Sequence, residues 1–155
     1  MRPICHVPLA GAVLLLFAAL SSCAAPEENG SFVRNTGKGP GDSYSFTVDL
    51  GDSLCRHALY FYTVMDASAK DFDSMPRLLQ LRIEAVSPSG DVFSEEAGID
   101  KYSYTRRGSF SVQYESLYRS GFTPVEYGRW AFRVEVLNGD DFPGLRGLGL
   151  KHEKL

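Results

Sequence analysis

Residues 44–50 read Tyr44-Ser45-Phe46-Thr47-Val48-Asp49-Leu50, and this short run carries the clearest folding signal in the chain. Apolar side chains alternate with polar ones along its whole length. Because successive side chains on a β-strand point to opposite faces of the sheet, this alternation predicts a strand with one buried and one exposed face. The run therefore favours a protein whose core lies on one side of each strand.

The same period of two recurs at residues 79–85, 110–114 and 130–136. Trp130 begins the last of these segments, and its place on the apolar side of the alternation predicts a core residue. Residues 58–65 differ, because they form a continuous run of β-prone residues. Such a run predicts a central strand that is covered on both faces.

Turn residues separate the predicted strands. Ser87-Pro88-Ser89-Gly90-Asp91 has Pro and Gly at turn-forming spacing, and Val92 and Phe93 then begin a short return strand, so a hairpin is expected here. Residues 67–75 are the one candidate helical stretch. Because this stretch is short and polar, it predicts a loop or a single turn.

The C-terminal region completes the pattern. A turn at residues 138–144 precedes a final strand, expected from about Gly147 to His152, with Leu148 and Leu150 on one face. About seven or eight short strands with frequent turns predict an all-β fold, a single antiparallel β-sandwich, with a barrel as the alternative arrangement.

Composition limits the class of partner. The 155 residues are 44% hydrophobic and 23% charged, as in an ordinary globular domain with or without an export segment. The formal net charge is −3, so the chain has no basic excess to attract a phosphate backbone. The sequence therefore argues against a nucleic-acid partner.

The first 22 residues have the three regions of an export signal. Arg2 supplies positive charge, residues 8–20 form an apolar run, and the small residues Ser21 and Ser22 follow. The apolar run is too short to cross a bilayer as a helix, which needs about 20 residues. Residues 1–22 therefore predict a cleaved signal peptide.

The cleavage region, Leu20-Ser21-Ser22-Cys23, resembles the lipobox of bacterial lipoproteins. The resemblance implies a diacylglyceryl group on the Cys23 sulfur, cleavage before Cys23 and acylation of the new amino terminus. Several acyl chains together give stable anchoring to a membrane. Ala24 follows the cysteine, and in enterobacteria-like sorting a residue other than aspartate there favours the outer membrane.

Residues 23–43 are small, polar and rich in glycine. They predict a lipidated cysteine and a flexible tether, in which Phe32 and Val33 leave room for a short first strand. The β-sandwich domain is accordingly expected over residues 44–155.

The cysteines predict no intramolecular disulfide. Cys5 leaves with the signal, Cys23 becomes a thioether and Cys55 is then alone. Cys55 is expected to be a half-buried small hydrophobe. A nucleophilic pair with His57 is the alternative, but the sequence supplies no further group to complete such a site.

The C-terminal third resembles the end of the gliding-motility lipoprotein GldH family. Residues 128–136, a turn and residues 143–152 match its pattern of a glycine, alternating aromatic and aliphatic residues, and a closing leucine–glycine strand. Residues 60–62 and 87–90 also look similar, whereas residues 97–121 depart from the pattern. The resemblance implies an accessory envelope protein that belongs to a larger complex, and it implies no defined reaction.

Catalytic, metal and cofactor signatures are weak. His57 and His152 are the histidines of the mature chain, and neither belongs to a His/Cys set at zinc spacing. Glu95 and Glu96 are adjacent on a predicted strand, so they point to opposite faces and cannot act together on one substrate. No phosphate loop, serine elbow or dinucleotide fingerprint occurs. The sequence predicts a protein that is not an enzyme and needs no cofactor.

Two functions remain open. The first is a lipid-anchored interaction module that meets an envelope protein through an exposed apolar patch or an unpaired sheet edge. The second is a glycan-binding module with exposed aromatic rings, for which the candidates are Tyr102, Tyr104, Tyr118 and Tyr127. Convergence of these rings on one open face would favour a sugar; rings that cap the core instead would favour the first function.

Overall fold

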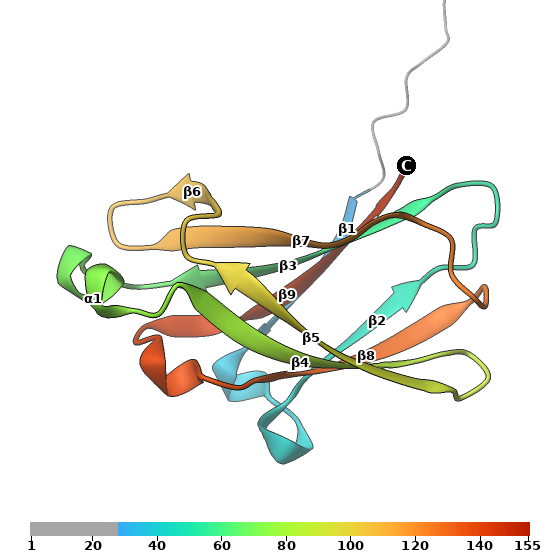
Figure 1. Cartoon of the computed structure of the whole chain (residues 1–155), viewed down its shortest axis with the longest axis horizontal. Helices are drawn as coiled ribbons and strands as arrows, with labels where there is room; N and C mark the ends of the chain where they lie inside the picture. The colour runs from blue at the N-terminus through green and yellow to red at the C-terminus, as the bar shows by residue number, and fades with distance from the viewer. Residues whose placement is uncertain (1–27) are drawn as a thin grey trace, which may run out of the picture.

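A computed structural model describes residues 28–155, which form two antiparallel sheets packed face to face (Figure 1). The five-stranded sheet has the order β1-β9-β3-β7-β6, and the four-stranded sheet has the order β2-β8-β4-β5. The predicted all-β sandwich is therefore confirmed. The elements are β1 (Glu28–Arg34), β2 (Tyr44–Asp49), β3 (His57–Met65), α1 (Ala69–Ser74), β4 (Leu78–Val86), β5 (Val92–Asp100), β6 (Tyr104–Arg107), β7 (Val112–Phe122), β8 (Arg129–Val136) and β9 (Leu145–Lys154).

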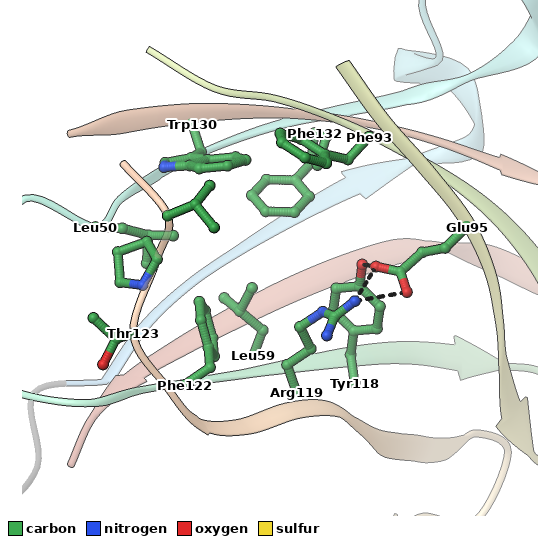
Figure 2. A pocket seen from close by; sticks show the side chains of 13 residues that line it. Leu50, Leu59, Phe93, Glu95, Tyr118, Arg119, Phe122, Thr123, Trp130 and Phe132 are labelled. Atoms are coloured by element: carbon green, nitrogen blue, oxygen red, sulfur yellow. Dashed lines mark hydrogen bonds and ion pairs between the residues drawn. The ribbon is translucent and has the colours of Figure 1, made fainter. Parts of the chain in front are cut away.

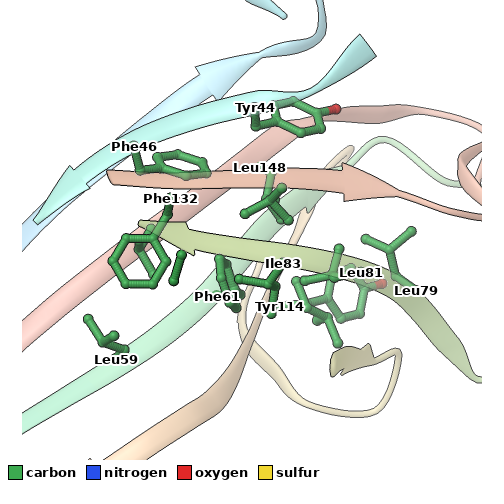
Figure 3. Close-up of a cluster of buried hydrophobic side chains, with 14 of the residues drawn as sticks. Tyr44, Phe46, Leu59, Phe61, Leu79, Leu81, Ile83, Tyr114, Phe132 and Leu148 are labelled. Atoms are coloured by element: carbon green, nitrogen blue, oxygen red, sulfur yellow. The ribbon is translucent and has the colours of Figure 1, made fainter. Parts of the chain in front are cut away.

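The core lies between the sheets and follows from the alternation in the sequence. Along most of β2, β4 and β8, every second residue is buried and the residues between them are exposed or half-buried. Tyr44 and Phe46 on β2 are buried in this way, and Trp130 on β8 is only 6% exposed. Figure 3 shows side chains from both sheets meeting in this core. The predictions of half-buried strands and of a core position for Trp130 are confirmed.

β3 is the middle strand of the five-stranded sheet, with β9 and β7 on either side. Its core-facing residues, such as Phe61, are buried, whereas Tyr60 and Tyr62 on the outward face are half-buried. Lys151 lies over the Tyr60 ring, with Nζ 4.4 Å from the ring centre, and Phe32 stacks on Tyr62. The central position is as predicted, but the expectation that both faces are covered is wrong, because side chains alone shield the outward face.

The domain boundary expected at residue 44 is corrected. Residues 28–34 form β1, which pairs with β9 from Glu28 opposite Glu153 to Arg34 opposite Gly147. The glycine-rich composition favoured a tether, but β1 gains its partner from the far end of the chain, which local composition does not encode. The rest of the expected tether that the structure describes, residues 35–43, contains two short 3-10 turns, Asn35–Gly37 and Pro40–Asp42. Residues 23–27, with Cys23, lie outside the described residues.

The described chain has nine strands, compared with the seven or eight expected. β1 and the four-residue β6 account for the excess, and the short strand expected at Val92 and Phe93 continues to Asp100. The final strand is also longer than predicted, although Leu148 and Leu150 are buried as expected.

Residues 69–74 form α1, slightly more than the loop or single turn that was expected. The Ser68 side chain accepts a hydrogen bond from the backbone N–H of Asp71, and the Asp71 carboxylate accepts one from the backbone N–H of Ser68. This reciprocal capping satisfies backbone donors at the start of the helix. Lys101 holds the other end, because its Nζ donates to the carbonyl groups of Phe72 and Met75.

The sandwich has two distinct ends. The proximal end, as we call it, carries the start of β1, the chain's C-terminus and the loops at residues 50–56, 87–91 and 123–128. The distal end carries α1 and the hairpin of β6 and β7, on the left of Figure 1. Both candidate binding sites described next lie at these ends.

Candidate functional site

An apolar pocket of about 270 Å³, the proximal pocket, opens between the two sheets near the proximal end. In Figure 2, Phe93, Trp130 and Phe132 of the four-stranded sheet face Leu59 and Phe122 of the five-stranded sheet across it. The walls therefore come from strands that are rigidly paired within their own sheets. Such a pocket suits an apolar group, since its burial removes hydrocarbon surface from water.

The polar part of the proximal pocket is a cluster that joins the two sheets. Nη2 of Arg119 on β7 lies 2.8 Å from both carboxylate oxygens of Glu95 on β5. The Tyr118 hydroxyl donates a further hydrogen bond to Glu95, as Figure 2 shows. The charges of Glu95 and Arg119 thus neutralise each other, and the cluster ties the edge strand β5 to β7.

The protonation of this cluster follows from its contacts. Partial burial raises the pKa of Glu95, but the hydrogen bonds from Tyr118 and Arg119 outweigh burial, so its pKa lies below the ordinary value of 4.5. Burial and the bond to Glu95 raise the pKa of the Tyr118 phenol, which stays protonated. The Glu95 carboxylate accepts hydrogen bonds here and is held as an ion, which suits a structural bridge better than a general acid.

Glu96, the neighbour of Glu95, lies on the other face of β5, where its carboxylate is 3.9 Å from Arg82. The prediction that Glu95 and Glu96 point to opposite faces is confirmed.

The structure brings together the two histidines that the sequence treated separately. His57 at the start of β3 and His152 on β9 are both buried, and Nδ1 of His57 lies 2.9 Å from Nε2 of His152. Nε2 of His57 faces the Asp52 carbonyl at 3.2 Å, so Nε2 carries the ring proton and donates to that oxygen, whereas Nδ1 accepts a hydrogen bond from the Nε2–H of His152. Sequence separation hid this contact, since the two residues meet only through the pairing of β3 and β9.

Cys55 lies in the loop before β3 and is half-buried, as predicted. Burial and the nearby Asp52 carboxylate raise the pKa of its thiol above the ordinary value of 9.0. A raised pKa disfavours the thiolate that a nucleophile requires. His57 is engaged by His152 and Asp52, so the local contacts do not assemble Cys55 and His57 into a catalytic pair.

A second hollow, the distal cavity, has a volume of about 450 Å³ and lies between α1 and the loop that joins β6 to β7. Phe110 forms part of its wall and is 87% exposed. Tyr114 also lines it, and although this residue is only 1% exposed, its hydroxyl has no hydrogen-bond partner among residues 28–155. A buried polar group without a partner is rare and costs about 1–3 kcal/mol. The alternation over residues 110–114 put Phe110 and Tyr114 on one apolar face; this is confirmed for Tyr114 and wrong for Phe110, which precedes β7.

The four candidate sugar-binding tyrosines do not share one face. Tyr102 and Tyr104 are exposed at the distal end, where Tyr102 packs edge-on against Phe72. Tyr118 packs against the core from the wall of the proximal pocket, and Tyr127 lies in the loop between β7 and β8 at the proximal end. The structure therefore divides the four tyrosines between the two ends, with Tyr102 and Tyr104 at the distal end and Tyr118 and Tyr127 towards the proximal end.

Across residues 28–155, no group of three His, Cys, Asp or Glu side chains is placed to hold a metal ion. In the same part of the chain, no helix has the length and apolar character required to span a bilayer. Cys23, the predicted lipid attachment site, is outside the described residues.

Comparison with known proteins leaves the geometry as the guide to function. No protein-family model matches the chain, and no curated protein matches it significantly.

Proposed function

We propose that this protein is a lipid-anchored accessory module of the bacterial cell envelope, of the GldH type, which binds a partner protein and catalyses no reaction. Cys23 is the anchor and the outer membrane is the favoured location, on the strength of the lipobox-like Leu20–Cys23 segment. The partner contacts the distal end of the sandwich.

The unpaired hydroxyl of Tyr114 is the observation that carries this proposal. Tyr114 lines the distal cavity with its hydroxyl buried, and the almost fully exposed Phe110 lines the same cavity. A partner that places a hydrogen-bond acceptor in the cavity and an apolar side chain against Phe110 would satisfy both groups at once. Fully desolvated polar contacts beside aromatic side chains are typical of the residues that dominate interface energies.

The surroundings of the distal cavity also suit a protein partner. Tyr104 and Arg107 lie on the edge strand β6, with the Arg107 guanidinium 5.3 Å from the centre of the Tyr104 ring. Tyr, Phe and Arg are enriched at protein interfaces. β6 pairs with β7 alone in the described sheet, so its other edge is open to a strand from a partner.

A glycan-binding function is less well supported. A sugar platform requires exposed rings on one surface, but Tyr118 packs against the core and Tyr127 lies at the opposite end from Tyr102 and Tyr104. We therefore keep the protein partner as the single proposed ligand.

Site-specific photocrosslinking in cells tests this function. A photoreactive phenylalanine analogue replaces Phe110 at the distal end or, as the control, Ala131, which is exposed on the outer face of β8. We expect a discrete protein adduct from position 110, none from position 131, and loss of the adduct when Tyr114→Phe is added. Equal adducts from both positions, or none from position 110, would overturn the proposal.

A further inference from the structure

The start of β1 lies close to the proximal pocket. Glu28 pairs with Glu153 of β9, and the next residue of β9, Lys154, pairs with His57 of β3. His57 in turn pairs with Phe122 of β7. Neighbouring strands are about 4.8 Å apart, so three steps across the sheet place the start of β1 roughly 15 Å from Phe122. Phe122 is itself a wall of the pocket.

The length of chain before β1 limits how far this end can stand from a membrane. Four residues lie between Cys23 and Glu28, so five residue-to-residue steps join them; an extended chain spans at most about 3.6 Å per step, or roughly 18 Å in all. The orientation of this end rests on the proposed anchoring at Cys23. With that anchor, the proximal end faces the bilayer at short range.

Exposed apolar side chains gather at this same end. Leu54, in the loop between β2 and β3, is 96% exposed, and Val125, in the loop between β7 and β8, is 82% exposed. Val125 also lines the proximal pocket. Apolar side chains on loops gain stability where they meet the boundary between headgroups and acyl chains. Their position therefore agrees with an end that touches lipid.

We infer that the proximal pocket takes one acyl chain of a bilayer phospholipid. Its volume of about 270 Å³ is smaller than a typical site for a drug-sized ligand, which is roughly 300–1,000 Å³, so it suits a single chain and not a pair. Its aromatic walls offer close contacts along the chain. The one ion pair in the pocket, between Glu95 and Arg119, is already neutral, so the chain meets no uncompensated charge.

The source of the chain follows from the same geometry. A chain that moves from the bilayer into the pocket exchanges one apolar surrounding for another, so close packing against the aromatic walls decides the binding. The bilayer supplies such chains at high local concentration next to the rim formed by Thr123 and Val125. The headgroup stays at the rim, in contact with water.

Trp130 is the chain's only tryptophan and lines the pocket, so its fluorescence reports occupancy. The full lipidated chain is reconstituted in vesicles of phosphatidylethanolamine and phosphatidylglycerol whose phosphatidylethanolamine carries bromine at mid-chain. Bromine quenches tryptophan at near contact, and Trp130 is buried between the sheets. We expect Trp130 to lose more than half of its emission relative to vesicles without bromine.

Two variants make the test specific. Ala85→Leu fills the pocket from β4 and should restore the emission, whereas Phe110→Ser at the distal end should leave quenching unchanged. Because bromine is on vesicle phospholipid alone, unquenched wild-type protein would overturn the inference, even if the protein's own Cys23-linked chain filled the pocket. If Ala85→Leu does not fold, the wild-type protein is tested instead with phospholipid that carries a photoreactive acyl chain. The inference then requires crosslinks at residues 122–132.

Flotation of the same vesicles separates the inference from the function on which it rests. Protein that floats but is not quenched contradicts the acyl-chain inference alone. Protein that does not float contradicts the anchor.

Discussion

Nδ1 of His57 and Nε2 of His152 lie 2.9 Å apart in the interior of the protein, joining the start of β3 to the end of β9. Burial lowers the pKa of His152 below its ordinary value of 6.5, and the neighbouring His57 and Lys154 lower it further. Asp49 and Glu153 act in the opposite direction but do not reverse the shift. His152 is therefore neutral at neutral pH and shares a hydrogen bond with His57.

This contact predicts a loss of stability in mild acid. Because the pKa of His152 is lower in the folded state, the unfolded chain binds more protons between that pKa and 6.5. The stabilisation is complete above the unfolded value and is lost as the pH falls through the folded one. The urea concentration at the unfolding midpoint should decrease as the pH is lowered from about 7.5 to about 5.5. Carboxyl groups remain ionised over this range. His152→Gln, which keeps a donor for His57, should flatten this dependence, and an unchanged slope in that variant would contradict the assignment.

Tyr114→Phe should make the protein more stable. The substitution removes a buried hydroxyl that has no partner among the described residues and keeps the ring in the core. We expect a gain of about 1 kcal/mol in the free energy of unfolding, measured with urea. Tyr44→Phe is the matched control, because the hydroxyl of this buried residue donates a hydrogen bond to Asn35 at 2.6 Å. Removing that hydroxyl should lower the free energy of unfolding. A loss for Tyr114→Phe would mean that its hydroxyl is satisfied, and the partner site would lose its main support.

The bridge between the sheets predicts a difference between two adjacent glutamates. Glu95→Gln should cost about 1 kcal/mol, less in high salt, because it weakens the contacts with Arg119 and Tyr118 in a partly exposed cluster. Glu96→Gln, on the outer face of the same strand, should change stability by no more than about 0.5 kcal/mol. Equal costs in chemical denaturation would show that the bridge contributes nothing specific.

Gly149 on β9 has no room for a side chain. A Cβ at this position would overlap the Tyr62 ring, which Phe32 holds in place by stacking. Gly149→Ala should therefore destabilise the protein by about 1–3 kcal/mol. Gly30→Ala serves as the control, since its Cβ would lie 3.7 Å from the Tyr62 hydroxyl, an ordinary contact. The two thermal midpoints should differ clearly, and a common midpoint would contradict the packing of Tyr62 on Gly149.

Local patterns accounted for much of the sandwich. Alternation placed the residues of β2 and β8 on the correct faces and Trp130 in the core, because a half-buried strand must alternate whatever its partners are. The same reasoning left room only for a short strand at Phe32 and Val33 and did not predict the full length of β1, whose partner β9 lies at the other end of the chain. Strand membership there depends on pairing and not on composition.

The candidate sites were harder to predict for the same reason. His57 and His152, or Glu95 and Arg119, meet through strand register and through the packing of one sheet on the other, and neither leaves a local pattern. Tyr118 was predicted as a candidate exposed ring, but its link to Glu95 depends on the approach of β5 to β7. Sequence alone therefore identified several participants without their contacts.

Metabolic labelling with an alkyne fatty acid tests the central claim, attachment of this module to the membrane through Cys23. Wild type, Cys23→Ser and Cys55→Ser are compared, since Cys55 is the other cysteine beyond the predicted signal peptide. The account predicts label on wild type and Cys55→Ser and none on Cys23→Ser. Label that survives in Cys23→Ser, or its absence from wild type, would contradict the anchor and the orientation of the domain that follows from it.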